Sequence, residues 1–458
     1  MMLPIIKPAA TEAYKVLVAD ESPVIRRAFR AFPATEIVVR DIVADRAELL
    51  QAVTQTEMLD AVLCADHLGG QFGGVQVLND LRDTQLLPPE TAFILMSGDS
   101  RKANLMTCLE AKPDEILLKP FSPEALVRKL ATVVSTRRAL AVLRTHARRQ
   151  DWPALLRDAS DMLAQGTPYK DDVEQLRLEA LGKVGQHDAI SALLQAKLET
   201  SPNSVRLLEA FARHSHQLGR LEDAERALNR LVKLQPANLQ AADLLAEVLL
   251  TRGAVVEAQQ RLQQALKQSP NSLQRHRVLG HLALFNGDPA TAEQAYLFAM
   301  RQHAEVHGLS DEDVVNSVRV LLLEGDTSRA WRMVGNAQLK LPHSRVLDLL
   351  ARLTEALVCR EYEALSRTQT RVTQGIALLN EAGLPCEGVL ILAAAEVCLM
   401  ASLPLRANRL CWDLLHTKPH VKLHPAQKIW AERLHKWSRD VQNEDLPQGL
   451  LHYQKYMK

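Results

Sequence analysis

Hydrophobic and polar residues follow two different patterns along the chain, and the pattern changes near residue 137. Before that point, short continuous apolar runs alternate with stretches in which apolar residues recur every three or four positions. Continuous apolar runs are typical of strands buried on both faces of a parallel sheet, and the longer period is typical of amphipathic helices. The expected strands are residues 15–20, 36–44, 60–66, 91–98 and 114–120.

Five strand–helix units in a row predict an α/β doubly wound (flavodoxin-like) fold, in which ligands bind at the carboxyl ends of the strands. Asp20, Asp66, Ser97 and Lys119 each end or directly follow one of the expected strands. Because the carboxyl ends of parallel strands meet at one edge of the sheet, we expect these four polar side chains to lie close together.

From about residue 139 onward the pattern is helical throughout and repeats every 34 residues. A Gly is followed by an Ala after five residues and by a Pro after another twelve. A Gly suits the end of a first helix, a small Ala allows a second helix to approach closely, and a Pro stops that second helix. The positions that carry this pattern are Gly185, Gly219, Gly253 and Gly287; Ala224, Ala258 and Ala292; and Pro202, Pro236 and Pro270.

The same offsets return after a four-residue insertion near Gly308, at Gly325, Ala330 and Pro342, and Ala364 lies another 34 residues on. This pattern resembles the tetratricopeptide repeat, in which pairs of antiparallel helices stack into an all-α superhelix. The predicted organisation is an N-terminal extension over 1–13, an α/β domain over 14–136, a linker helix over 137–150, helical repeats over 151–420, and capping helices with a tail over 421–458.

Four segments of the α/β domain carry the candidate chemistry: VLVADESPVIRR, VLCADHLGGQFGG, FILMSGDS and ILLKPF. In their order and spacing they resemble the receiver domain of bacterial two-component response regulators, over residues 14–136. The resemblance implies that Asp66 takes a phosphoryl group from a histidine kinase or phosphotransfer protein. It also implies that Ser97 and Lys119 contact the phosphoryl oxygens.

The same resemblance implies a Mg²⁺ site formed by Asp20, Glu21 and Asp66, with a backbone carbonyl near Leu68. Three carboxylates at one sheet edge repel one another, and a hard divalent cation with oxygen ligands relieves that repulsion. Mg²⁺ is therefore the expected cofactor.

Asp60 is an alternative phosphoacceptor, because it too borders the third expected strand. It opens that strand, however, and would lie at the wrong end of the sheet. Counting back from Gly74, where the helix pattern GVQVLNDLR begins, places Asp66 at the acceptor position. We therefore favour Asp66.

Two positions depart from the family pattern. Glu21 replaces the commoner Asp, and Ile116 stands where the family often has an aromatic residue that couples phosphorylation to a change of surface. The second departure keeps open an alternative function, a phosphorylation-independent pseudoreceiver that serves with the repeats as a scaffold.

Composition and charge exclude several other classes of protein. The 458 residues hold 55 Lys and Arg against 54 Asp and Glu, which gives no overall electrostatic attraction to nucleic acid. No DNA-reading module remains once the repeats are assigned, and no apolar run reaches the length of a membrane span. The six cysteines form no C-x-x-C pair, so we expect a reducing, cytoplasmic location. No catalytic constellation occurs in the repeats, so we expect no enzyme activity beyond the receiver's own phosphotransfer and dephosphorylation.

The repeats predict a surface for a protein partner. In the tetratricopeptide family the inner groove is lined mainly by the first helix of each pair, and a polar surface without a ligand is the alternative. The candidate groove residues are Arg206, Glu209, Arg213, Gln240, Asp243, Glu247, Arg277 and His281. The identity of the partner, the direction of regulation and the pairing of two copies into a homodimer stay open.

Overall fold

The computed structural model describes residues 13–32, 36–56, 58–68, 73–99, 101–380, 384, 386–418, 421 and 423–440. The predicted N-terminal extension, apart from residue 13, lies outside these ranges, as do residues 69–72 of the glycine-rich loop and the tail after residue 440. The chain divides into two compact units, one formed by 1–240 with 268–271 and the other by 241–267 with 272–458. Among the helices in the described ranges, none is both long and apolar enough to cross a bilayer.

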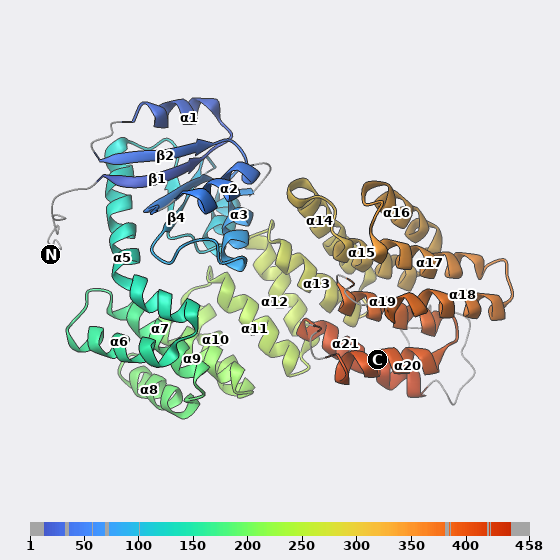
Figure 1. Ribbon diagram of the computed structural model, residues 1–458. Helices are drawn as coiled ribbons and strands as arrows, with labels where there is room; N and C mark the ends of the chain where they lie inside the picture. The colour runs from blue at the N-terminus through green and yellow to red at the C-terminus, as the bar shows by residue number, and fades with distance from the viewer. Residues whose placement is uncertain are drawn as a thin grey trace. The chain divides into compact units, whose positions relative to one another are not determined.

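The first unit starts with a five-stranded, all-parallel sheet in the order β2-β1-β3-β4-β5. Figure 1 shows β2 beside β1 in this sheet. All residues of the inner strands β3 and β4 are buried, as the continuous apolar runs predict. The predicted doubly wound parallel sheet is therefore confirmed. The strands are β1 (Tyr14–Ala19), β2 (Ile37–Val43), β3 (Ala61–Ala65), β4 (Ala92–Ser97) and β5 (Glu115–Leu118).

Helices cover both faces of this sheet, because successive residues of a strand point to opposite sides. Leu17 of β1 belongs to a core shared with α2, α3 and α4, whereas its neighbour Val16 belongs to a core shared with α1 and α5. The helices are α1 (Pro23–Arg30), α2 (Arg46–Gln55), α3 (Gly73–Asp83), α4 (Lys102–Glu110) and α5 (Pro123–Arg149).

Helix α5 belongs to two hydrophobic cores. Ser122 caps its start, and it then runs for 27 residues to a left-handed residue at Gln150. In its first half, Leu126 and Leu130 pack against the sheet. In its second half, Leu140 and Leu143 pack with side chains of α6 and α7. The predicted linker segment, 137–150, is therefore the continuation of the last helix of the sheet layer.

The rest of the chain is helical. The helices of the first unit are α6 (Trp152–Ala164), α7 (Lys170–Lys183), α8 (His187–Thr200), α9 (Val205–Gln217) and α10 (Leu221–Leu234). Those that follow are α11 (Leu239–Thr251), α12 (Val255–Gln268), α13 (Leu273–Phe285), α14 (Pro289–His307), α15 (Asp311–Glu324), α16 (Thr327–Lys340), α17 (Arg345–Cys359), α18 (Leu365–Ala377), η1 (Leu378–Asn380), α19 (Glu387–Met400), α20 (Pro404–His416) and α21 (Pro425–Asp440).

The residues of the 34-residue pattern take the positions that their chemistry predicts. The repeat glycines follow the first helix of each pair and have φ between +71° and +83°, a region that favours glycine: Gly185, Gly219, Gly253, Gly287 and Gly325. The repeat alanines are fully buried where the second helix packs: Ala224, Ala258, Ala292 and Ala330. The predicted all-α repeat fold is confirmed.

The repeat register predicted at Ala364 is wrong. Ala364 is exposed and stands just before the first residue of α18. Thr368, four residues later, is fully buried in its place. The cause is a longer connection, since α17 extends to Cys359 and a turn follows before α18 begins.

The core of the second unit contains a charged pair. Arg319 of α15 and Glu396 of α19 are each 2% exposed, and the Nη2 and Nε atoms of Arg319 donate to Glu396 over 2.6 Å and 2.9 Å. Trp430 of α21 donates from Nε1 to the same carboxylate over 2.8 Å. Three helices far apart in the sequence thus share one buried carboxylate.

We predict that Glu396→Ala destabilises the second unit by about 3 to 5 kcal/mol, because it leaves the buried Arg319 guanidinium without its carboxylate. Urea-induced unfolding followed by tryptophan fluorescence measures the change. Glu355→Ala is the matched control, since Glu355 pairs with Arg371 at 3.6 Å on the exposed surface of the same unit and should cost less than about 1 kcal/mol. Equal destabilisation by the two variants would contradict the prediction.

Candidate functional site

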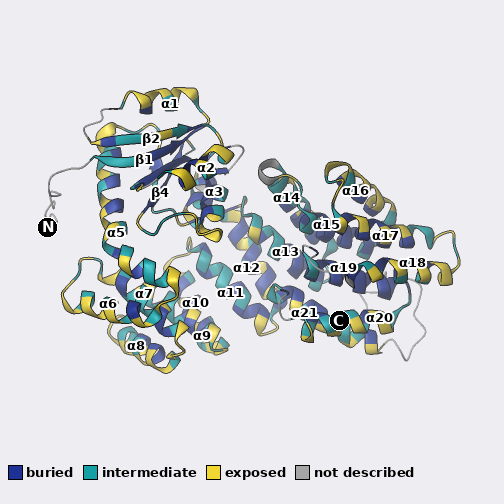
Figure 2. Cartoon of the chain, viewed as in Figure 1, coloured by how far each residue is buried: buried dark blue, intermediate teal, exposed yellow. Residues whose placement is uncertain are grey.

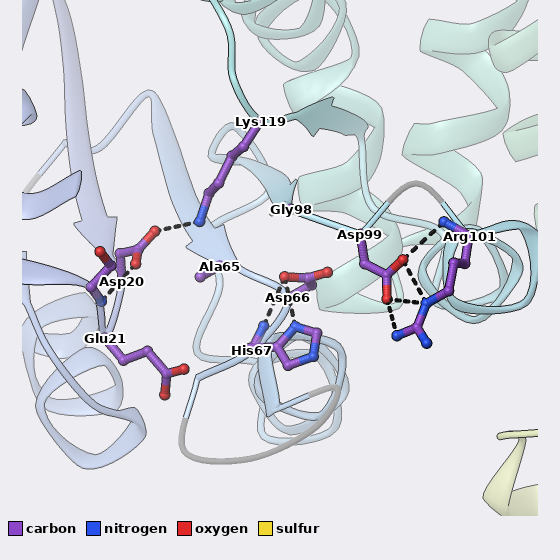
Figure 3. A pocket seen from close by; sticks show the side chains of 10 residues that line it. Asp20, Glu21, Ala65, Asp66, His67, Gly98, Asp99, Arg101 and Lys119 are labelled. Atoms are coloured by element: carbon purple, nitrogen blue, oxygen red, sulfur yellow. Dashed lines mark hydrogen bonds and ion pairs between the residues drawn. The ribbon is translucent and has the colours of Figure 1, made fainter. Parts of the chain in front are cut away.

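The carboxyl ends of the strands bring the predicted site residues together. Asp20 follows β1, Asp66 follows β3, Ser97 ends β4 and Lys119 follows β5. The two aspartates and the serine are at most 2% exposed. Asp20, Asp66 and Lys119, together with the exposed Glu21, line one open cavity of about 490 Å³ (Figure 3).

Asp66 accepts hydrogen bonds at both carboxylate oxygens. The Ser97 hydroxyl donates to Oδ2. The backbone N–H of His67 donates to Oδ1 over 2.9 Å, and Nδ1 of the same imidazole lies 3.0 Å from that oxygen. The side chain of His67 also lines the cavity (Figure 3). Neither the apolar periodicity nor the spacing of the polar residues predicts this histidine contact.

Asp20 is held from two sides. Its Oδ2 pairs with Nζ of Lys119 at 2.6 Å, and its Oδ1 accepts the backbone N–H of Ser22 over 2.9 Å. The guanidinium of Arg26 donates from Nη1 to the carbonyl oxygens of Asp20 and Glu21, both over 2.8 Å. Arg26, on the first helix, therefore fixes the backbone that presents the acidic pair.

The backbone at Asp66 is held in place by the start of α3. The N–H of Gly74 donates to the carbonyl of Asp66 over 3.1 Å. A Cβ added at Gly74 would come within 2.0 Å of the carbonyl oxygen of Ala65, so only glycine fits. At Gly73 an added Cβ would come within 1.9 Å of the carbonyl oxygen of Leu68. That carbonyl therefore faces α3, and Leu68 is not among the residues that line the cavity.

A second charged pair borders the cavity beside Ser97. Asp99 accepts hydrogen bonds from the Arg101 side chain, from its backbone N–H over 2.9 Å, and from Asn104. The Arg101 hydrogen bonds hold the pKa of the Asp99 carboxyl well below its usual range. Asp99 therefore stays ionised and keeps Arg101, whose side chain is 77% exposed, at the rim of the cavity.

Two buried cysteines close to the site are not candidate nucleophiles. Burial raises the pKa of the Cys64 thiol well above its usual value, and the nearby Asp20 and Asp66 charges add to the effect. Burial also raises the pKa of Cys108 to about 12. Both side chains therefore remain thiols at neutral pH, and the reactive thiolate does not form.

The donor set of the cavity fits a hard divalent cation. Asp20, Glu21 and Asp66 supply carboxylate oxygens to one water-accessible space, and oxygen is the ligand atom that Mg²⁺ prefers. Among the described residues, no group of three or more His, Cys, Asp or Glu side chains is arranged to hold a metal ion. Lys119 and His67 instead contact the oxygens of Asp20 and Asp66.

Asp60 and Ile116 lie away from this cavity. Asp60 directly precedes β3, at the opposite end of the strand from Asp66. It accepts the backbone N–H of Lys15 over 2.9 Å and pairs with Arg138 at 2.6 Å. Ile116 lies within β5, half-buried, and its carbonyl accepts a hydrogen bond from Lys129 over 3.0 Å. Asp60 is thus engaged in structural contacts.

Four of the predicted groove residues on α9 and α11 form ion pairs at the surface or close to it. Arg206 pairs with Asp171 at 2.7 Å, and Arg213 pairs with Glu209 one turn away at 2.6 Å. Asp243 pairs with the buried Arg275 at 2.6 Å. Gln240 and Glu247 complete this set, and both are partly exposed.

The groove residues of α13 are not presented to a partner. Arg277 pairs with the buried Asp313 at 2.7 Å. His281 is 9% exposed, with Nδ1 at 2.6 Å from the Tyr296 hydroxyl and Nε2 at 3.3 Å from Nε2 of Gln427 in α21. Burial holds the pKa of His281 well below its usual value, and the nearby His424 lowers it further. Helix α21 therefore covers His281, and Asp313 of α15 engages Arg277.

Comparison with known proteins matches the N-terminal part to one family. The model of the response regulator receiver domain matches residues 16–131. The chemotaxis protein CheY1 of Helicobacter pylori is 28% identical over 127 residues, which are 27% of this chain and 98% of that protein.

Among solved structures, a signal receiver domain of an HD domain-containing protein from Pseudomonas fluorescens is 22% identical, with a TM-score of 0.25; the match covers 28% of this chain and 99% of that one. A tetratricopeptide repeat protein from Parabacteroides merdae is 14% identical, with a TM-score of 0.38, over 63% of this chain and 99% of that one. The chain thus carries a response regulator receiver domain at residues 16–131, followed by helical repeats of the tetratricopeptide kind.

Proposed function

We propose that the chain is a response regulator of a two-component system, phosphorylated on Asp66 by a histidine kinase or a phosphotransfer protein. Its output is contact between the helical repeats and a protein partner. The observation that carries this proposal is the convergence of Asp20, Glu21, Asp66 and Lys119 on one open cavity, with Ser97 bonded to Asp66. The receiver family match to residues 16–131 supports the same chemistry.

The proposed reaction is a phosphoryl transfer to a carboxylate. An oxygen of Asp66 forms a bond to phosphorus as the bond from phosphorus to the donor breaks, and the bonding electron pair leaves with the donor's imidazole or acetate. The product is a mixed carboxylic–phosphoric anhydride on Asp66. The cavity is open to solvent, which gives the donor access to a carboxylate that is itself 2% exposed.

Lys119 and Ser97 have separate roles in this proposal. The Lys119 ammonium, now paired with Asp20, lies where it can offset negative charge on the transferred group. The Ser97 hydroxyl, now bonded to Asp66 Oδ2, is free to rotate and donate to a phosphoryl oxygen instead.

Mg²⁺ is the proposed cofactor; Asp20, Glu21 and Asp66 would hold it, and when bound it would supply positive charge toward the phosphoryl oxygens. Arg26 supports this set by positioning the backbone of Asp20 and Glu21. We do not include the Leu68 carbonyl among the ligands, because it faces Gly73.

The remaining parts of the proposal concern location and output. All six cysteines are free thiols, which favours the reducing cytoplasm. The proposed activity is limited to the receiver's own phosphotransfer and dephosphorylation. For the partner surface of the repeats we propose the residues on α9 and α11. On α13, Asp313 of α15 pairs with Arg277, and Gln427 of α21 contacts His281.

We predict that acetyl phosphate with Mg²⁺ adds one phosphoryl group to the wild-type chain and none to Asp66→Ala. Asp60→Ala is the matched control, because Asp60 borders the same strand at its other end and should leave labelling intact. Intact mass spectrometry measures the incorporation, and circular dichroism establishes that both variants fold. Labelling that survives in Asp66→Ala and disappears in Asp60→Ala would reverse the assignment.

An absence of labelling in the wild type, under conditions where another receiver is labelled, would instead favour the pseudoreceiver scaffold. Ile116 would then be the first position to examine, because the aromatic residue of the usual coupling is missing there.

We predict that Lys119→Ala slows phosphoryl incorporation about 100-fold at the same Mg²⁺ concentration, because the ammonium that offsets the phosphoryl charge is lost. Lys129→Ala is the control, since Lys129 pairs with Glu115 at 2.8 Å on the neighbouring surface and should stay within about twofold of wild type. The measurement is the time course of incorporation by intact mass. Equal rates for the two variants would remove Lys119 from the proposed chemistry.

A further inference from the structure

An irregular interval of the repeat pattern, the insertion near Gly308, coincides with a cavity in the second unit. The four-residue insertion near Gly308 lengthens α14 to 19 residues, whereas α13 has 13 and α15 and α16 have 14 each. Between α14, α15 and α16 the structure leaves an open cavity of about 410 Å³. Met300, Leu309 and Met333 form its apolar wall. The space can accept a bulky apolar side chain.

The rim of this cavity is basic, and none of the described residues that line it carries a carboxylate. Arg329, Arg332, Asn336 and Lys340 line it from α16. The sequence of α16 contains no Asp or Glu between Thr327 and Lys340. Its positive charge is therefore not balanced within the helix itself.

Two of the rim cations lack an acidic partner. Arg329 is paired with Glu293 of α14. Among the described residues, the guanidinium of Arg332 donates from Nε to the carbonyl of Ser328, over 3.4 Å, and to no carboxylate. Within the described part of the chain, neither Arg332 nor Lys340 forms an ion pair. Their charges thus remain available to an acidic ligand.

Large apolar side chains stand beside these cations. Trp331 is 41% exposed and Leu339 is 83% exposed, and both lie on α16. Gly335 lies between them, one turn from each, and leaves open space where a side chain would otherwise stand. Figure 2 shows exposed residues along this helix. Exposed aromatic and aliphatic groups beside unpaired cations are typical of protein interaction surfaces.

The length of the surface distinguishes a peptide from a small anion. Arg332 and Lys340, the two rim cations without an acidic partner, are eight residues apart, which is about 12 Å along a helix. A single carboxylate or phosphate cannot contact cations spread over that length. A segment of several residues can place one apolar side chain in the cavity and acidic side chains along the rim.

We propose that the surface formed by α14, α15 and α16 around this cavity binds an acidic peptide segment of a partner protein. A bulky apolar side chain of the peptide enters the cavity beside Met300 and Met333. Its Asp or Glu side chains pair with Arg332 and Lys340. None of the residues of this surface belongs to the proposed inner groove on α9 and α11, and its binding requires no phosphorylation of Asp66.

Panning of a phage-displayed library of random 12-residue peptides against the unphosphorylated full-length chain tests the proposal. We expect enrichment of peptides that carry at least two acidic residues near a Leu, Phe or Trp. Synthetic copies of the enriched peptides should lose affinity as the salt concentration rises. Copies in which every Glu and Asp is replaced by Gln and Asn should bind at least tenfold more weakly.

The location is tested with Arg332→Glu/Lys340→Glu, which should weaken the enriched peptides at least tenfold, as fluorescence polarisation measures. Lys233→Glu/Lys267→Glu is the matched control and should stay within about twofold, because these exposed lysines occupy the ends of the second helices α10 and α12. Met333→Gln tests the apolar wall and should also weaken binding.

Three outcomes would overturn the proposal. One is the absence of enriched acidic peptides, and another is equal affinity of those peptides for Arg332→Glu/Lys340→Glu and the control. The third is binding of phosphatidylserine vesicles that is lost in Arg332→Glu/Lys340→Glu without any enriched peptide, which would make a lipid surface the ligand. Because the chain is unphosphorylated throughout, none of these outcomes bears on Asp66.

Discussion

The negative charges of two buried carboxylates, Asp20 and Asp66, need hydrogen-bond donors or cations beside them. This requirement determines how the first unit is built at the carboxyl edge of its sheet. An ionised carboxylate buried without a partner costs several kcal/mol, so Asp20 and Asp66 require donors from their surroundings. Lys119 supplies one at the end of β5, and Ser97 supplies another at the end of β4. The ends of four strands are therefore linked by polar contacts, although the strands themselves are held by apolar packing.

Much of this site could be predicted because it depends on topology. In a parallel sheet every strand ends at the same edge, so the polar residue that follows each apolar run is placed with its neighbours before any side chain is considered. Asp66, Ser97 and Lys119 are of this kind. Arg26 and His67 could not be predicted in this way. Their contacts follow from the backbone turns at Asp20 and Asp66, which the hydrophobic periodicity does not indicate.

The repeats show the same division between local and distant requirements. The repeat glycines and alanines could be placed from the sequence, because each answers a need within its own hairpin: a left-handed turn or a close helix contact. The accessibility of Arg277 and His281 could not be predicted from the sequence. That of Arg277 depends on Asp313 in the next repeat, and that of His281 depends on Gln427, 146 residues away. Likewise, Thr368 replaces Ala364 because the preceding turn is longer.

The unbroken course of α5 has a consequence for how the length of this chain can vary. The helix leaves the core of the sheet at Val134 and enters the core of the next hairpin at Leu140. Each residue of an α-helix adds about 1.5 Å and turns the following residues by about 100°. Loss of one residue between these positions would therefore swing the hairpin about a quarter of a turn around the sheet layer. Insertion of seven residues rotates the hairpin through nearly two full turns, so that it faces almost its original direction. The number of residues between the two cores can therefore change only in steps close to a whole number of helical turns, such as about 7, 11 or 18 residues, if the hairpin is to keep its facing.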